Sequence, residues 1–421
     1  MSRPASLAAW LAYLETLHPK AIALGLERVR DVLGRLPAHI DCPVITVGGT
    51  NGKGSTCAML ESIYRSAGYA TGLYASPHLL RYNERIRIRG AEAGDEALVQ
   101  SFNAVEDARG DVPLTYFEFG TLAALWLFAR ARLDVLVLEV GLGGRLDAVN
   151  AVDADVAVIT SVDIDHVDYL GPTRDGIGRE KAGIFRPSRP AICGDRDPPA
   201  TVEATARDIG ATLLVLGRDY DFTDERTQWR YRGPRGERYG LPVPALRGAY
   251  QLANASTALA AIDLLHDRLP VSAQGIREGL LAVVLPGRFQ VLPGRPTVVL
   301  DVAHNPHAAR ALADALATMG FHPQTFAVCA MLADKDMRGV VDALRPRIDR
   351  WFVAGLPGAR GGGPVRMRDA LLAAGVDDVA VRAYDDVATA FRAARVDASE
   401  ADRIVVFGSF FTVAAALDAA A

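Results

Sequence analysis

The sequence predicts an α/β protein with a doubly wound, P-loop-containing N-terminal domain and a smaller Rossmann-like C-terminal domain. Three observations predict this fold. Short apolar runs alternate with longer alanine- and leucine-rich stretches, as strands of a parallel sheet and their covering helices do. A glycine-rich loop follows the first of these runs. The chain has 421 residues, half of them hydrophobic, which is too long for one ordinary core.

The N-terminal domain is expected to span residues 1–288. Short, β-rich apolar runs predict five strands in it, over residues 44–47, 71–74, 135–140, 156–160 and 191–193. The segment 229–241 is rich in arginine, glycine and aromatic residues and predicts a hairpin or exposed excursion on this domain. Helical patterns follow over 249–265 and 273–285.

Three prolines, Pro286, Pro293 and Pro296, then interrupt the chain within a few residues. They predict a linker at about 286–296. The C-terminal domain is expected over 296–421, because apolar runs again alternate with helical patterns. Its strands are expected at 298–302, 325–330, 351–354 and 404–407.

Composition excludes several classes of protein. The formal charge is −4 with lysine and arginine scattered along the chain, so neither a nucleic-acid nor a membrane surface is expected. The four cysteines are far apart and form no C-x-x-C pair, which argues against disulfides and structural zinc. The N-terminus lacks an apolar signal segment, and no apolar run approaches the ~20 residues that span a bilayer. We expect a cytoplasmic monomer whose partners are small molecules.

A glycine-rich loop at residues 48–54 follows the first expected strand. Its glycines let backbone N–H groups approach phosphate oxygens, Lys53 adds a positive charge, and the next helix offers its positive N-terminal end. The loop departs from the G-x-x-x-x-G-K-[ST] motif, because Val47 replaces the first glycine and Gly54 separates the lysine from the hydroxyls. It predicts a nucleotide phosphate site, with a serine or threonine hydroxyl for Mg²⁺, made by Thr50, Asn51, Gly52, Lys53, Gly54, Ser55 and Thr56.

Candidate metal ligands follow two further strands. Glu139 ends an apolar run, and the acidic segment 161–168, which contains His166, follows the strand expected at 156–160. Ligands of open parallel sheets bind outside the carboxyl ends of the strands. Magnesium combines a few protein oxygens with phosphate oxygens and water, so Glu139 is expected to bind it. The alternative for Glu139 is an ion pair with Arg145. The alternative for the segment that contains His166 is a solvated acidic loop.

Lys181 lies in the segment 178–184, which is expected to be helical. A buried lysine near two cations is electrostatically unfavourable. Addition of CO₂ to its neutral amine would give N6-carboxylysine, an anion suited to magnesium. The alternative is an unmodified lysine that pairs with phosphate or Glu180.

The loop 141–147 superficially resembles a dinucleotide fingerprint and raises an NAD-dependent oxidoreductase as a rival. The third glycine of G-x-G-x-x-G would fall at Leu146, and no clear helix follows. The spacing therefore argues against NAD binding.

The chain resembles the bacterial dihydrofolate synthase/folylpolyglutamate synthase family of the Mur ligase superfamily. The resemblance covers almost the whole chain and rests on the variant GTNGKGST loop together with the runs at 76–79, 81–86, 115–118, 138–148, 178–184 and 301–306. The runs around Glu139 and Lys181 are typical of this branch.

The resemblance implies an ATP-dependent ligase that joins L-glutamate to dihydropteroate and to reduced folates. A carboxylate acylates an amine only after its oxygen becomes a good leaving group, so an acyl phosphate intermediate is expected. A folylpolyglutamate synthase alone and a Mur-type cell-wall ligase are the enzyme alternatives, although the N-terminal UDP-binding domain of the latter is missing. A non-catalytic nucleotide switch is the alternative from another class.

The resemblance also implies roles for individual residues. Two Mg²⁺ sites are expected, with ligands among Ser76, Glu139, His166 and Ser55. The nucleotide is expected to contact Asn254, Arg288 and Asp301 in addition to the phosphate loop. The catalytic residues are expected to be Lys53, Lys181 and His304. The acceptor substrate is expected to contact Ala21, Ile22, Leu24, Arg81, Thr115, Tyr116, Phe117, Glu118, Leu146, Asp147 and Ala148.

One residue departs from the family pattern. Ala23 stands where related bifunctional sequences carry an aspartate for the pterin ring, which puts the dihydropteroate reaction in question while leaving Asp147 to serve the pterin. Alternatives also remain for the nucleotide set: a polar helix face for Asn254, a surface salt bridge for Arg288 and an N-cap network over 301–306.

Overall fold

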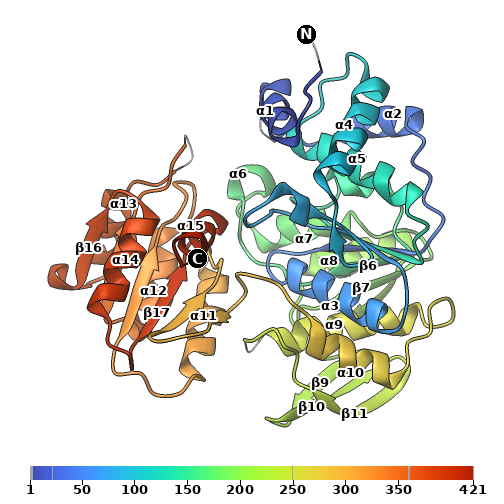
Figure 1. Ribbon diagram of the computed structural model, residues 1–421. Coiled ribbons are helices and arrows are strands. Elements are labelled where there is room, and N and C mark those ends of the chain that lie inside the picture. The colour runs from blue at the N-terminus through green and yellow to red at the C-terminus, as the bar shows by residue number, and fades with distance from the viewer. Residues whose placement is uncertain (1–2, 21, 249, 359–360, 421) are drawn as a thin grey trace. The chain divides into compact units, whose positions relative to one another are not determined.

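The computed structural model describes residues 3–20, 22–248, 250–358 and 361–420. The chain forms two compact units, one of Met1–Ala245 with Leu252–Val283 and one of Leu246–Gln251 with Val284–Ala421. Each unit has its own largely parallel sheet with helices, which confirms the predicted α/β class (Figure 1).

The first unit contains an eight-stranded sheet in the order β4-β3-β2-β5-β1-β6-β7-β8. The central strand β1 pairs in parallel with β5 on one side and β6 on the other. The five expected strands are confirmed, and β3, β4 and β8 are additional. The apolar signal of these three strands in the sequence is weak, because β3 and β4 are short and β8 has an exposed end. The bounds are β1 Val44–Gly48, β2 Thr71–Tyr74, β3 Ile86–Ile88, β4 Ala91–Glu92, β5 Val135–Glu139, β6 Val156–Ile159, β7 Pro190–Cys193 and β8 Thr212–Val215.

Helices of this unit pack on its sheet through buried apolar residues. The strands β1, β5 and β6 are buried along their whole length, as expected for strands covered on both faces. The helices are α1 Leu7–Leu17, α2 Glu27–Arg35, α3 Lys53–Ser66, α4 Asp95–Arg109, α5 Tyr116–Arg130, α6 Val167–Leu170, α7 Arg174–Ala182, α8 Ala200–Ile209, α9 Gln251–Leu264 and α10 Ala273–Ala282, with short 3₁₀ turns η1 Tyr82–Arg85 and η2 Ala148–Ala151.

The expected hairpin is part of a small three-stranded sheet in the order β11-β10-β9. Its strands are β9 Asp221–Asp224, β10 Gln228–Gly233 and β11 Gly236–Pro242. The hairpin is confirmed, but part of it packs against the rest of the unit. Trp229 and Tyr231 are buried, and the Tyr231 hydroxyl donates to Asp263 of α9 at 3.1 Å.

The second unit contains a six-stranded sheet in the order β12-β13-β17-β14-β15-β16, drawn mainly in orange and red in Figure 1. Within the segment 286–296, where a linker is expected, β12 pairs with β13 in antiparallel fashion. The strands are β12 Gln290–Leu292, β13 Thr297–Leu300, β14 Thr325–Cys329, β15 Arg350–Ala354, β16 Val381–Tyr384 and β17 Arg403–Phe407. The helices are α11 Pro306–Ala317, α12 Met337–Leu344, α13 Pro364–Ala373, α14 Val387–Asp397 and α15 Phe410–Ala420, with 3₁₀ turns η3 Arg345–Arg347 and η4 Asp378–Ala380.

Two further features concern the cysteines and the length of the helices. All four cysteines are free thiols. None of the helices in the described part of the chain has the length and apolar character needed to cross a membrane.

Candidate active site

The glycine-rich loop connects β1 to α3 and has a conformation that two of its glycines make possible. Gly49 has φ 144°, and a Cβ there would lie 1.9 Å from Thr160 Oγ1. Gly52, the N-cap of α3, has φ 88°, and a Cβ there would lie 2.4 Å from Asn254 Oδ1. Among the described residues, no side chain forms an N-cap hydrogen bond to α3. The loop therefore presents backbone at the positive end of a helix, as phosphate-binding loops do.

Lys53 and the hydroxyl residues occupy the first turn of α3. The Lys53 ammonium donates to the carbonyls of Gly49 and Thr50, each at 3.1 Å, so the side chain folds back over the loop. Ser55 and Thr56 are buried, and within the described structure Thr56 Oγ1 has no hydrogen-bond partner. A buried hydroxyl without a partner at this place fits a loop that closes on a ligand.

Residues at the exit of β6 hold the phosphate loop in place. The Thr50 N–H donates to the Ser161 carbonyl at 2.8 Å, and Thr160 Oγ1 donates to the Asn51 carbonyl at 2.6 Å. The Thr50 hydroxyl donates to the Asp163 carbonyl at 3.0 Å. The sequence reasoning did not identify Thr160 and Ser161 as loop partners, because only the pairing of β6 with β1 brings them there.

The predicted metal ligands lie after the carboxyl ends of neighbouring strands. The order β2-β5-β1-β6 places Ser76, Glu139, the phosphate loop and His166 along one edge of the sheet. Glu139 is buried, and its Oε2 accepts from the Ser76 N–H at 3.1 Å. His166 is the N-cap residue of α6 and has φ 52°, and its backbone N–H donates to Asp165 Oδ1 at 2.8 Å.

This donor set fits magnesium better than a transition metal. The described residues contain no group of three or more His, Cys, Asp or Glu side chains that could hold a metal ion. Magnesium does not need such a cage, since it takes one or two carboxylates and completes its shell with substrate phosphates and water. A buried carboxylate beside the hydroxyls of a phosphate loop meets that requirement.

Lys181 is buried on α7 and is electrostatically coupled to the phosphate loop. Burial, together with the nearby charge of Lys53, lowers the pKa of its amine to about 7, although the carboxylate of Asp165 acts in the opposite direction. A substantial fraction of this amine is therefore neutral near pH 7, which is the form that reacts with CO₂.

The loop 141–148 joins the N-terminal segment in the predicted acceptor region. Asp147 is buried and accepts from the N–H groups of Leu142 at 2.8 Å and Val149 at 3.1 Å. Burial raises the pKa of Asp147 to about 7. The Gly25 N–H donates to the Leu146 carbonyl at 3.4 Å, so this loop meets the segment that contains Ile22 and Leu24. Both of these side chains are half-buried, Ala148 is buried, and Ala21 lies outside the described residues.

The start of α5 contributes further predicted acceptor residues. Thr115 and Glu118 form a capping box, in which the buried Glu118 accepts from the Thr115 N–H at 2.8 Å. The other Glu118 oxygen accepts from Arg28 at 2.8 Å, so both oxygens of this carboxylate bind protein groups. Phe117 lies against Gly141, where a Cβ would approach its ring to 2.7 Å.

The remaining predicted acceptor residues differ in exposure. Tyr116 is half-buried under the Arg85 guanidinium, which lies 5.5 Å from the centre of its ring. Arg81 is 64% exposed in its side chain and lies 4.0 Å from Glu92 and 3.7 Å from Asp95. The ion pairs of the Arg81 side chain are therefore solvated and weak.

Three of the predicted nucleotide and catalytic residues lie in the second unit, near the exit of β13. Asp301 is buried and accepts from the N–H groups of Phe289 and Ala303, each at 2.8 Å. Burial raises the pKa of Asp301, while the Arg288 guanidinium opposes the shift. His304 Nδ1 donates to the Val302 carbonyl at 2.8 Å, because a carbonyl can only accept.

Two other second-unit contacts complete this group. Arg288 lies over the ring of Phe410, 5.0 Å from its centre, and the Tyr250 hydroxyl bonds Asp301. Sequence reasoning did not include Tyr250. The remaining predicted nucleotide residue, Asn254, lies in the first unit beside the phosphate loop.

Comparison with known families agrees with this arrangement. The Mur ligase middle domain matches residues 47–262, which include the phosphate loop, Glu139 and Lys181. The Mur ligase, glutamate ligase domain, matches residues 287–410, which include Asp301 and His304. The chain belongs to the Mur ligase family. Members of this family are ATP-dependent ligases, and this chain is one of them.

Individual relatives narrow the group within the Mur ligases. A dihydrofolate synthase/folylpolyglutamate synthase of Escherichia coli (strain K12) is 48% identical over 409 residues, which cover 97% of this chain and 94% of the relative. The structure of E. coli FolC in complex with DHPP and ADP has a TM-score of 0.93 at 47% identity, covering 98% of this chain and 97% of that one. A bifunctional folylpolyglutamate synthase/dihydrofolate synthase with Mn, AMPPNP and L-glutamate bound has a TM-score of 0.91 at 48% identity, covering 99% and 98%. The predicted family is confirmed.

Proposed function

We propose that this Mur ligase joins L-glutamate to dihydropteroate, giving dihydrofolate, and also adds L-glutamate to reduced folates, with ATP as the energy source. The observation that carries the proposal is the glycine-built loop at the start of α3 with the buried Glu139 on the adjacent strand. The ligands named for the similar structures, ADP, AMPPNP, DHPP and L-glutamate, support the same pair of reactions.

The reaction has two chemical steps. In the first, a carboxylate oxygen of the acceptor forms a bond to the γ-phosphorus of ATP, and the bond from that phosphorus to ADP breaks. In the second, the α-amine of glutamate attacks the acyl carbon, inorganic phosphate leaves with the bonding electron pair, and the amine loses a proton. Lys53 is proposed to neutralise charge on the transferring phosphoryl group.

Ser55, Ser76, Glu139 and His166 are the residues proposed to hold Mg²⁺, in two sites. Bound there, the cation would supply charge neutralisation on the phosphate oxygens. The buried carboxylate of Glu139 is the strongest of these donors, and its hydrogen bond from the Ser76 N–H fixes its orientation.

Lys181 is proposed to be N6-carboxylysine in the active enzyme. Its neutral amine adds to CO₂ with release of one proton, and the product is an anion. The lowered pKa of the buried amine and the proximity of Lys53 favour this change, because it replaces repulsion between two cations by attraction.

The other proposed contacts follow the sequence prediction. Arg288 and Asp301 are proposed to contact the nucleotide, with Asn254, and His304 is proposed to act in catalysis. The acceptor is proposed to lie against loop 141–148, the N-terminal segment and the start of α5. Asp147 is proposed to serve the pterin in place of the aspartate that Ala23 replaces. We also propose a cytoplasmic monomer.

A substrate panel tests the proposal. The purified protein is given ATP, Mg²⁺ and L-glutamate with dihydropteroate, a tetrahydrofolate or a UDP-linked muropeptide precursor, and amide products are identified by mass spectrometry. We expect products from the first two acceptors and none from the third. Product from tetrahydrofolate alone would reduce the function to folylpolyglutamate synthesis. Product from the muropeptide precursor, or nucleotide binding without any amide product, would contradict the proposal.

A further inference from the structure

Val162, in the loop that leaves β6, is held through both of its backbone polar groups. Its N–H donates to Asp195 Oδ2 at 3.0 Å, and its carbonyl accepts from Arg174 Nε at 3.0 Å. The Arg174 guanidinium also donates to the same Asp195 oxygen at 3.3 Å. Two hydrogen bonds thus connect one backbone residue with an arginine–aspartate pair, and a third joins the two members of the pair.

The residues on either side of Val162 bind the phosphate loop. Ser161 accepts from the Thr50 N–H at 2.8 Å, and the Asp163 N–H donates to Thr50 Oγ1 at 3.0 Å. The segment 160–163 therefore lies between the phosphate loop on one side and the Arg174–Asp195 pair on the other. Because the bonds alternate along the segment, a shift of Val162 would displace the partners of Thr50.

Arg174 also occupies the first position of α7, the helix that carries Lys181. The two residues are seven apart, which is about two helical turns and places them on the same face. Asp195 follows β7. The pair therefore connects the exits of two parallel strands with the start of the helix that carries Lys181.

We propose that Arg174 and Asp195 are positioning residues for the ATP-dependent reaction. They fix the segment 160–163, and through it the shape of the phosphate loop, without touching a substrate. The inference rests on the proposed function, because the reaction it serves is the proposed ligation.

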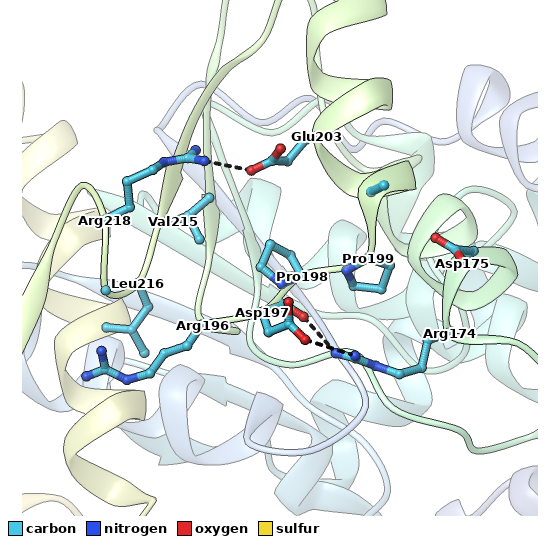
Figure 2. A pocket seen from close by; sticks show the side chains of 12 residues that line it. Arg174, Asp175, Arg196, Asp197, Pro198, Pro199, Glu203, Val215, Leu216 and Arg218 are labelled. Carbon is cyan, nitrogen blue, oxygen red and sulfur yellow. Dashed lines mark hydrogen bonds and ion pairs between the residues drawn. The ribbon is translucent and has the colours of Figure 1, made fainter.

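Arg174 is accessible from solvent through a surface pocket, which it lines with Asp197, Glu203 and Arg218 (Figure 2). Its side chain is 39% exposed and lies 3.7 Å from the carboxylate of Asp197, which is 96% exposed. Figure 2 shows Arg174 and Asp197 facing one another, whereas Arg218 pairs with Glu203 at 2.6 Å. The solvated Asp197 carboxylate contributes little to holding Arg174. The pocket would admit a small guanidinium ion after truncation of the arginine.

The test uses Arg174→Ala, with Arg174→Lys as the conservative variant and Asp197→Ala as the matched control. For Arg174→Ala we expect faster hydrogen–deuterium exchange at the amides of residues 160–163 without nucleotide, because the local restraint is lost. We expect the KM for ATP to rise about tenfold, as for other supporting residues of a site. Millimolar guanidinium should reverse part of both effects. Arg174→Lys should show intermediate effects, and Asp197→Ala should behave as the wild type.

The outcomes separate this inference from the function on which it rests. An active wild type with unchanged exchange and unchanged KM in Arg174→Ala would overturn the inference alone. A second result would also overturn the inference alone. In it, Arg174→Ala loses activity through global unfolding and does not respond to guanidinium, while Arg174→Lys is fully active. A wild type that forms no amide would overturn the proposed function and this inference with it.

Discussion

The two units use the same strand-to-helix connection in opposite ways. In the first, β1 leads into α3, whose N-cap is Gly52 with a positive φ, and no side chain in the described part of the chain caps this helix. In the second, β13 leads towards α11, where Asn305 Oδ1 accepts from the Ala308 N–H at 2.9 Å and Pro306 occupies the first turn. The first helix end is suited to an anion, while the second is completed by the protein's own side chain.

This difference shows that topology alone does not create a phosphate site. Both helices follow a buried strand of a largely parallel sheet, and both present a positive N-terminal end. What differs is the chemistry of the connection: glycines and Lys53 in one, Asp301, His304 and a capping asparagine in the other. The N-cap expected as an alternative for 301–306 is thus present, and it coexists with the buried Asp301.

The largest effect is expected at Lys53. Lys53→Ala should lower the rate of ligation by about 10³-fold, because the variant loses the positive charge that is proposed to neutralise the transferring phosphoryl group. The fold should be retained, since the ammonium donates to backbone carbonyls of its own loop. Glutamate-dependent phosphate release measures the rate, and circular dichroism checks the fold. Normal turnover in this variant would remove the phosphate-loop assignment.

Lys181 provides the next largest effect. Lys181→Ala should lower the rate of ligation by about 10²-fold, as when one stabilising charge is removed from a site. Acetate or another short carboxylate should restore part of the lost rate. The reason is that the proposed carbamate would act as an anion. Mass measurement of the native protein under non-acidic conditions should detect the added carboxyl group. Rescue by small amines, with no response to carboxylates, would instead establish Lys181 as a cation.

Glu139→Gln and His166→Ala sharpen the assignment of the metal site. Each removes one proposed ligand, so the Mg²⁺ concentration that gives half of the maximal rate should rise by about 10- to 100-fold. Magnesium titrations of both variants measure the change. Titration curves that coincide with the wild type would show that neither side chain binds the cation.

The smallest effects come from a matched pair of cap substitutions. Gly52→Ala should weaken nucleotide binding, because the added Cβ would lie 2.4 Å from Asn254 Oδ1 at a backbone φ of 88°. Asn305→Ala should lower the free energy of unfolding by about 1 kcal/mol through loss of the cap, with an unchanged rate of ligation. Denaturant unfolding and ATP titration distinguish the two. Equal effects of both substitutions on nucleotide affinity would contradict the contrast between the two helix ends.

Much of the fold could be predicted from sequence where an element is long and buried. Strands such as β5, with the sequence Val-Leu-Val-Leu-Glu, give a continuous apolar run. The strands that were missed have weaker signals: β16 has two exposed residues among its four, and β12 lies between prolines. Tertiary pairing stabilises such strands, and local composition does not show it.

The same limit applies to the site. The phosphate loop was predictable because its function resides in consecutive residues. The bonds from Thr160 to Asn51 and from Arg174 to Val162 were not, because they depend on which strands are neighbours in the sheet. Tyr250 was missed for a similar reason, since its contact with Asp301 joins segments 51 residues apart.

The most direct test of the contrast between the two helix ends is calorimetric titration of AMPPNP, with Mg²⁺ present, into the wild type, Lys53→Ala and Asn305→Ala. The account predicts equal affinity for the wild type and Asn305→Ala, and an affinity lower by at least about tenfold for Lys53→Ala, equivalent to the loss of about 1.4 kcal/mol. Unchanged affinity in Lys53→Ala, or an equal loss in Asn305→Ala, would contradict it.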